Sequence, residues 1–569
     1  MATHAVADRP AIAGRRYRWS IIGLVAVVSV LSSALYPVYA RSHGVVGFPL
    51  DDAWIHQTYA RNLAQTGQLA YLPGQPSAGS TSPTWSFILS VAYMLEIDFR
   101  LWTYLVGCLA LATTACLTYR LFLRLPPLRP GTVAPSQGKR GSSRVGRTWL
   151  GEWAEPKAAL LAGLLCAMEW HLVWASVSGM ETILFTALSL ALLEYYFNHI
   201  AAVHVPQASG SHGQAGEPTS VHKEQTIVRA IGIGLLAGVL VLTRPEGVVL
   251  AGLVLLGMVG VPWPSTRDEF RLRLVAAGVA LAAMAAALSP YVAFNLRTSG
   301  TIFPNTFYAK QAEYRTELPI WTRLWRVLSP TLVGAQALLL PGFIYSVYYL
   351  AARLRERRNW PAVLPVVWWL AILSLYAVRL PVSYQHSRYT MPSIPLLILD
   401  GVWGTAQMIR PHSARMWVRI LSRAVPAAAA ILALLFWWRG ASVYRDDVGF
   451  IEGEMVAVSR WLGENSAPGD LIAVHDIGAI GYLTDRPLLD LAGLITPEVI
   501  PFIADAGQLA DWMAARGAAY AVFFPDFSPT YAQLATDPRF QQVHCADHAW
   551  TRTAGHHNLC AYRLLGSDP

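Results

Sequence analysis

The run WSIIGLVAVVSVLSSALYPVYA (residues 19–40) leads directly into GFPLDDAWIHQTYARNL (residues 47–63). The first stretch carries no charged side chain, and it is long enough to cross a bilayer because a membrane-spanning helix needs roughly 20 apolar residues. The second stretch places two adjacent acids, Asp51 and Asp52, just beyond the end of that helix. We therefore predict a first helix that is retained, rather than cleaved as a signal peptide, and that leads into an acidic loop.

The composition favours many membrane spans. Of 569 residues, 54% are hydrophobic and 14% are charged, whereas soluble globular proteins carry about 25% charged residues. The net charge of +9 does not indicate nucleic-acid binding, because most Arg and Lys residues flank apolar runs, as the positive-inside rule expects. We predict a polytopic α-helical membrane protein. The eleven runs that could span are 19–40, 101–122, 157–177, 181–199, 227–243, 247–262, 274–295, 331–352, 360–380, 391–409 and 418–439.

Charge also orients the chain. The four arginines before residue 19 place the N-terminus in the cytoplasm. A further apolar stretch, 85–95, is only about half a span long. If it lies along the membrane surface, every basic loop falls in the cytoplasm, so we predict an interfacial helix there and an extracytoplasmic C-terminus. The Gly-, Ser- and Pro-rich loops at 123–155 and 200–226 are expected to be flexible and cytoplasmic.

The chain changes character at about residue 440, where helical and strand patterns begin to alternate. Such alternation is typical of a small α/β domain. We expect a membrane domain at 1–439, with its first outer loop at 41–100, and an extracytoplasmic domain at 440–569, called the tail below. The expected tail elements are helix 453–464, strand 471–475, helix 476–483, strand 487–491, helix 508–516, strand 519–524 and two short edge strands, 540–545 and 559–564.

Polar residues collect at the ends of the spans that this topology places outside. Ionisable groups at membrane depth are costly and therefore indicate function. One of the paired acids Asp51 and Asp52 suits a general base, since adjacent acids repel and one pKa can rise. Capping of the helix that begins there is the alternative. Asp52 and His56 are four residues apart and share a helix face, a weak indication of a divalent metal site; the cofactor is otherwise unknown.

Three cations on the same side, Arg244, Lys310 and Arg388, are candidates to hold a phosphate, because both Arg and Lys bind phosphate oxygens. The alternative for each is an interfacial side chain that reaches towards lipid headgroups. Glu246 could pair with Arg244 or cap the next helix. The other candidate substrate-binding residues are Arg61, Glu181, Asn305, Tyr308, His386 and Tyr389.

Two cysteines, Cys545 and Cys560, lie in the tail. Because the topology places the tail in an oxidising compartment, and because pairing of the two edge strands could bring the sulfurs together, we predict a disulfide. The alternative is a metal site in which Cys545 joins nearby histidines, although their spacing is not that of a standard zinc site. These histidines are His544, His548, His556 and His557.

The run from Asp51 to Trp85 resembles the first outer loop of the GT-C glycosyltransferases. Further motifs follow in the order found in the branch that contains the terminal arabinofuranosyltransferases of mycobacterial cell walls. They are SGMET (178–182), RPEG (244–247), PNTFYAK (304–310), RYTMP (388–392) and, in the tail, segments of 476–494. This sequence differs in having Trp54 where Tyr or Phe is usual, and in the Ser/Thr-Pro run before Trp85, which leaves the sugar open.

The resemblance implies a GT-C-like membrane fold and a polyprenyl-phosphate-linked sugar as donor. An extracytoplasmic glycan, lipid or protein would be the acceptor, and Asp51 and Asp52 would match the acid that serves as catalytic base or metal ligand. Three alternatives remain. A transporter or flippase of lipid-linked sugars would place its polar groups at mid-membrane. A membrane-anchored glycan-binding protein would leave the acids and cations unexplained. A polymerase or ligase using diphosphate-linked oligosaccharides would need a larger cavity.

Overall fold

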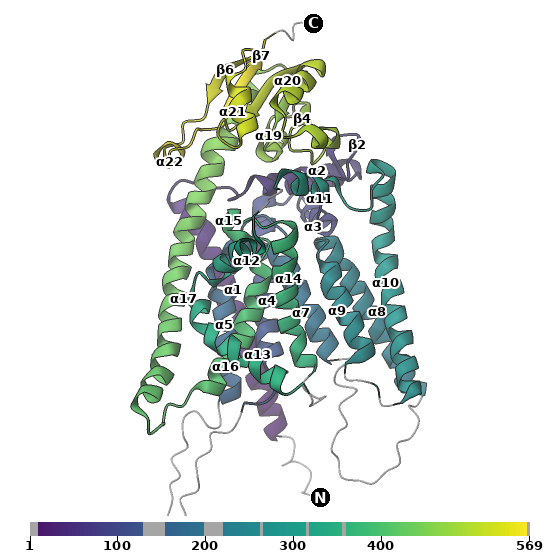
Figure 1. Ribbon diagram of the computed structural model, residues 1–569, viewed down its shortest axis with the longest axis vertical. Helices are drawn as coiled ribbons and strands as arrows, with labels where there is room; N and C mark the ends of the chain where they lie inside the picture. Colours follow the sequence, from purple (N-terminus) through teal and green to yellow (C-terminus); the bar gives the residue numbers. More distant parts are fainter. Residues whose placement is uncertain are drawn as a thin grey trace, which may run out of the picture.

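The computed structural model describes residues 9–128, 154–198, 220–261, 264, 266–314, 318–354 and 360–565. Long helices run roughly side by side, and a small sheet domain lies at one end of the bundle (Figure 1). The start of α1 (Arg9–Ser42) and this domain lie at opposite ends of the molecule. The chain is thus a polytopic helical membrane protein with a small C-terminal sheet domain, as its apolar runs predict.

Every predicted apolar run contains helix. Seven helical segments of the described chain are long and apolar enough to cross a membrane, and α5 and α6, bent by 54° at their junction, would make an eighth. The number of spans, about eleven, stays a prediction. The bundle helices are α1, α4 (Phe99–Phe122), α5 (Ala154–Met168), α6 (Trp170–Ser176), α7 (Thr182–Tyr196), α8 (Ser220–Thr243), α9 (Gly247–Gly260), α10 (Arg267–Ser299), α13 (Leu340–Ala352), α14 (Leu364–Arg379), α16 (Ile394–Met408) and α17 (Met416–Ile451).

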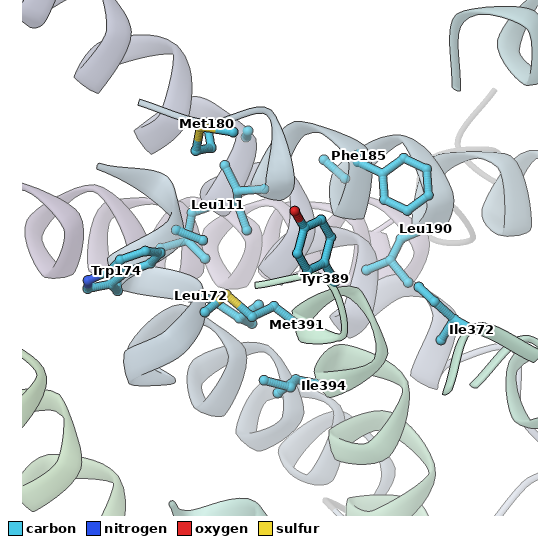
Figure 2. Packing of buried hydrophobic residues seen from close by; sticks show 14 of the residues in the cluster. Leu111, Leu172, Trp174, Met180, Phe185, Leu190, Ile372, Tyr389, Met391 and Ile394 are labelled. Atoms are coloured by element: carbon cyan, nitrogen blue, oxygen red, sulfur yellow. The ribbon is translucent and has the colours of Figure 1, made fainter. Parts of the chain in front are cut away.

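Small residues allow some of these helices to pack backbone against backbone. A Cβ atom added to Gly404 of α16 would lie 1.8 Å from the carbonyl oxygen of Gly342 in α13. Close approach at glycine is a common basis of helix association in membranes, where lipid tails are as apolar as the helix surface. Larger side chains fill the rest of the core, and Figure 2 shows Met391 and Ile394 below Tyr389, whose hydroxyl points away from them.

Two short helices lie where the sequence places the first outer loop. α2 (Asp51–Thr66) begins with the acid pair, and α3 (Pro83–Met94) covers the stretch predicted to be interfacial. α3 has 12 residues, too few to span. It packs against α2, and the buried Trp85 donates its indole N–H to the Gly179 carbonyl at 2.9 Å. Its position along the membrane face stays a prediction. Most of the predicted loops 123–155 and 200–226 lies outside the described residues.

The tail contains every element predicted for it. Its sheet has five strands in the order β4-β3-β5-β7-β6, with β3, β4 and β5 parallel and β6 and β7 antiparallel. A disulfide joins Cys545 and Cys560, which face each other on β6 and β7. The tail elements are α18 (Ala457–Asn465), β3 (Leu471–Val474), α19 (Ile477–Leu483), β4 (Leu488–Asp490), α20 (Ala506–Ala515), β5 (Ala518–Phe523), α21 (Pro529–Thr536), β6 (Phe540–Cys545), α22 (Ala549–Thr553) and β7 (Cys560–Leu564).

A buried carboxylate just after α17 joins the start of the tail to its last part. Glu454 accepts hydrogen bonds from the Thr551 hydroxyl and the Asn558 amide, both at 2.6 Å, and from the Leu559 N–H at 2.8 Å. A buried carboxylate with three donors is well satisfied, whereas loss of its partners would be costly. α17 is continuous through residue 440, so the predicted boundary between the two domains falls inside a helix, and the domain division stays a prediction.

Candidate active site

A cavity of about 280 Å³ lies where α2, α9, α14 and α11 (Asn305–Glu313) meet. Figure 1 shows α2 and α11 at the end of the bundle that faces the tail. The apolar side chains that line it include Val248, Val249, Phe303, Phe307, Leu375 and Leu380. Eight residues singled out in the sequence also line it and contact one another, and we call them the charged wall: Asp52, His56, Glu181, Arg244, Glu246, Lys310, Arg388 and Tyr389.

Asp52 is the carboxylate at the centre of the charged wall. Its Oδ2 accepts a short hydrogen bond from Nη2 of Arg388 and lies 3.5 Å from Nζ of Lys310. These partners come from three segments far apart in the sequence: the start of α2, the middle of α11, and the turn between α14 and α16. The fold therefore gathers one acid and two cations from separate motifs onto one side of the cavity.

These charges determine the ionisation of Asp52. Burial disfavours the carboxylate, but the positive charges of Lys310 and Arg388 outweigh it and hold the pKa of Asp52 well below its ordinary value. Burial likewise disfavours charged Lys310, whereas the carboxylate of Asp52 raises the pKa of Lys310. Both groups are therefore charged at neutral pH.

Tyr389 lies beside this acid and its two cations. Its hydroxyl accepts hydrogen bonds from Nζ of Lys310 at 2.9 Å and from Nη2 of Arg388 at 3.2 Å. The guanidinium of Arg244 lies 5.1 Å from the centre of its ring, a distance at which cation–π attraction is effective. Burial opposes ionisation of the phenol, but the charges of Arg388 and Lys310 lower the pKa of Tyr389 below its ordinary value.

A second charged group adjoins the first. Arg244 donates to Glu246 Oε1 at 2.6 Å and to the Tyr376 hydroxyl at 2.9 Å, and its Nη1 lies 3.6 Å from Glu181. His56 Nε2 lies 3.3 Å from the other oxygen of Glu181. Arg244 is therefore held by side chains, and Tyr376 is a cavity residue that the sequence analysis missed, because a tyrosine inside an apolar run gives no separate signal.

Five other predicted site residues do not line the cavity. Asp51 faces the tail, and Arg61 of the same helix donates to the Tyr482 carbonyl at 3.0 Å. His386 lies 2.7 Å from Asp447 of α17, a residue that the sequence analysis also missed although it follows a span and has an acidic neighbour. Asn305 begins α11, and Tyr308 is partly exposed on the same helix.

Asp51 is buried at the contact between α2 and α19. Its two carboxylate oxygens accept the N–H groups of Gly478 and Ala479 at 2.7 and 2.8 Å. Burial and the charge of nearby Asp476 raise the pKa of Asp51, although the two N–H groups oppose this shift. The adjacent His475 lies 2.9 Å from Glu313 of α11. The tail therefore contacts α2 and α11, the helices that carry Asp52 and Lys310.

The two residues considered for a metal site, Asp52 and His56, each contact another charged side chain. Asp52 and His56 both line the cavity, but Asp52 is paired with cations and His56 with Glu181. Among the described residues, no set of three or more His, Cys, Asp or Glu side chains is grouped as metal ligands are. The histidines near Cys545 are included in that statement, and Cys545 itself is in the disulfide.

Several solved membrane-protein structures resemble this chain in fold. A family described as a domain of unknown function (DUF8728) matches residues 443–561, which is the tail alone. No curated protein matches the sequence. Among solved structures, ArnT from Cupriavidus metallidurans in the apo state is 16% identical with a TM-score of 0.55, over 98% of this chain and 99% of that one.

Two further solved structures were captured with lipid phosphates. ArnT bound to undecaprenyl phosphate is 15% identical with a TM-score of 0.55, over 99% of both chains. The archaeal oligosaccharyltransferase AglB from Archaeoglobus fulgidus, in complex with an inhibitory peptide and a dolichol-phosphate, is 13% identical with a TM-score of 0.57, over 90% of this chain and 70% of that one. At such identities the similarity concerns the fold. The chain has the fold of the GT-C membrane proteins.

Proposed function

We propose that this protein is a membrane glycosyltransferase that moves a sugar from a polyprenyl-phosphate donor to an extracytoplasmic glycan, lipid or protein acceptor. The observation that carries the proposal is the convergence of Asp52, Lys310 and Arg388 in a cavity that is lined by both charged and apolar side chains. A lipid phosphate has the matching chemistry, because its head is anionic and its chain is apolar. The lipid phosphates bound to the GT-C neighbours support this donor class.

In the proposed reaction, an acceptor hydroxyl attacks the anomeric carbon of the donor sugar. The new bond joins the acceptor oxygen to that carbon, and the bond from the carbon to the phosphate oxygen breaks. The departing polyprenyl phosphate keeps the electron pair, and Arg388 and Lys310 hold its charge. The hydroxyl proton passes to Asp52, which acts as general base.

The cations beside Asp52 affect its ability to act as a general base. A carboxylate whose pKa is held far below neutrality is a weak base. A bound phosphate would compete with Asp52 for Lys310 and Arg388, and this competition would raise the pKa of Asp52. Donor binding thereby prepares the base. Asp51, which faces α19 instead of the cavity, is assigned a structural role in this proposal.

The orientation follows from the charge distribution of the sequence. With the N-terminus in the cytoplasm, the tail and the cavity beneath it face the extracytoplasmic side of a cell membrane. Among sugars, arabinofuranose is the first to test, because the first outer loop and the motifs in order resemble the arabinofuranosyltransferase branch. The donor would then be a polyprenyl-phosphate arabinofuranose.

The test is transfer of labelled sugar from synthetic polyprenyl-phosphate donors to a glycan acceptor by the full-length protein in nanodiscs. The wild type should transfer label, and Lys310→Met should raise the KM for the donor by about tenfold or more, as loss of a hydrogen bond between charged groups predicts. Arg516→Met, which removes an exposed cation of the tail that does not line the cavity, is the matched control and should have the KM of the wild type.

The alternatives give different results. A flippase would move the labelled lipid across the bilayer without cleaving the sugar from the phosphate. A glycan-binding protein would bind the glycan and would neither bind nor cleave the labelled donor. If no donor of either a hexose or a pentofuranose is consumed by protein that binds lipid phosphate, the glycosyltransferase proposal is wrong.

A further inference from the structure

The backbone just before Arg388 has an unusual conformation. Gln385, His386 and Ser387 have φ angles of 53°, 56° and 55°, so three consecutive residues with side chains adopt the left-handed region. L-residues avoid this region because Cβ comes too close to the following carbonyl oxygen. Such segments persist only where the surrounding structure holds them, and they are concentrated at functional sites. We therefore expect contacts with neighbouring segments to stabilise this turn.

His386 is the side chain by which the turn is held. Its Nε2 lies 2.7 Å from Oδ2 of Asp447 in α17, and the indole N–H of Trp174 in α6 donates to the same oxygen at 2.8 Å. The imidazole also lies edge-on to the rings of Trp174 and Trp170, with centroids 5.1 and 5.4 Å away. Figure 2 shows the Trp174 nitrogen at the margin of the hydrophobic cluster, pointing away from Tyr389. We call His386, Asp447 and Trp174 the latch.

The three latch residues do not line the cavity, but Arg388, two residues after His386, does. Nη2 of Arg388 contacts Asp52 and the Tyr389 hydroxyl. Nη1 of Arg388 is buried and has no hydrogen-bond partner among the described residues. A buried guanidinium nitrogen without a partner is costly. The place of this guanidinium in the cavity depends on the backbone that carries it.

We propose that the latch is a positioning device: it holds the left-handed turn 385–387 so that the guanidinium of Arg388 stays beside Asp52 in the cavity, where the phosphate of the lipid donor binds. This inference rests on the proposed function. His386 then acts through Arg388 and does not touch the substrate. Asp447 and Trp174 contribute by fixing His386 to α17 and α6. Neither of these helices carries a cation that lines the cavity.

The experiment measures binding of undecaprenyl phosphate to the full-length protein in nanodiscs, which requires no catalysis. His386→Ala and Asp447→Asn should each weaken binding by about tenfold, part of the loss expected when a hydrogen bond to a charged group is removed. His386→Gln, whose amide can donate to Asp447, should restore most of the affinity. Hydrogen exchange should quicken at residues 384–390 in His386→Ala and leave the tail unchanged.

A double-mutant cycle separates positioning from a general structural effect. If His386 acts through Arg388, then His386→Ala should have no further effect on affinity in an Arg388→Met background. His556→Ala is the matched control, because His556 forms a 2.9 Å pair with Asp526 on the surface of the tail. Its affinity should equal that of the wild type.

The two proposals fail in different ways. Wild-type protein that does not bind undecaprenyl phosphate would contradict the proposed function, and the latch with it. Two outcomes would overturn the latch alone. In the first, His386→Ala binds undecaprenyl phosphate as tightly as the wild type. In the second, His386→Ala lowers the affinity equally in the wild-type and Arg388→Met backgrounds. A His386→Ala protein that does not fold is replaced by Asp447→Asn, for which the same two outcomes apply.

Discussion

Asp51 and Asp52 are neighbours in the sequence but belong to two different regions of the molecule. Asp51 lies in the contact between α2 and the tail, where it accepts two backbone N–H groups. Asp52 lies in the cavity, where it meets Arg388 and Lys310. Their pKa values shift in opposite directions, upwards for Asp51 and downwards for Asp52, because burial dominates the first and neighbouring cations the second.

A helix explains how one step along the chain separates them. Successive residues of an α-helix point about 100° apart, since there are 3.6 residues in each turn. The first turn of α2 therefore presents one acid to the tail and the next to the cavity. The pair is not a shared proton site: the carboxylate of Asp51 joins α2 to α19 of the tail, and that of Asp52 lines the cavity.

The largest expected difference between the two acids is catalytic. Asp52→Asn should lower the rate of sugar transfer about 10²–10⁴-fold, the usual loss when a general base is removed. Thermal stability should also fall, because the asparagine is isosteric but carries no charge to pair with Lys310 and Arg388, so the rates are compared at a temperature where both proteins are folded. Asp446→Asn, a more exposed acid paired with Arg445, is the control. Wild-type turnover by a folded Asp52→Asn protein would refute the assignment.

The next effect concerns stability. Asp51→Ala leaves the N–H groups of Gly478 and Ala479 without acceptors, and it should destabilise the attachment of the tail by about 1–3 kcal/mol. Limited proteolysis of the tail and thermal unfolding measure this. Gly478→Ala should act in the same direction, since its Cβ would lie 2.0 Å from the Asp51 carbonyl oxygen, while Gly469→Ala meets open space and serves as control.

The two acids should also respond oppositely to pH. The pKa of Asp51 is raised from 3.8 to about 7, so the folded state binds this proton more tightly than the unfolded state. The stabilisation that protonated Asp51 contributes is therefore lost as pH rises from about 4 to 7, by about 1 kcal/mol per pH unit. Asp52, with a lowered pKa, stabilises the fold above its ordinary pKa and loses that contribution as pH falls.

Thermal unfolding of wild type and Asp51→Asn in one detergent, between pH 4.5 and 7.5, checks this expectation. The stability advantage of the wild type over the variant should shrink as pH rises. His475 lies in the same contact and has a raised pKa: burial opposes its charge, but Asp476 and Glu313 outweigh burial, so it must be kept unchanged in both proteins. Parallel stability curves would contradict the role assigned to Asp51.

The smallest effect is expected at Arg61. Its guanidinium donates to the Tyr482 carbonyl, stacks 4.5 Å from the Tyr482 ring centre and lies 3.6 Å from the exposed Asp485. Arg61→Met should lower stability by less than about 1 kcal/mol, because such partly exposed contacts are weak. The KM for the donor should be unchanged. A raised KM would return Arg61 to the substrate-binding residues and would weaken the distinction between the two regions.

Local sequence patterns were enough to predict the membrane bundle, the tail and most of the charged residues that line the cavity. Apolar runs and alternating patterns depend on nearest neighbours along the chain, so they identify helices and strands without tertiary information. The disulfide could be predicted for the same reason, because two short strands on either side of one loop pair locally. Eight of the thirteen residues proposed for substrate, base or metal line one cavity.

Which of these residues contact one another depends on the tertiary structure. No pattern in the sequence shows that Asp52 faces Arg388, more than 300 residues away, or that Asp51 faces Gly478 instead. His386 looked like a cavity residue because it is close to Arg388 in the chain, yet it turns to Asp447. The physical reason is that contacts between distant segments depend on helix rotation and backbone conformation, and a rotation of one residue, or a left-handed turn, redirects a side chain to another partner.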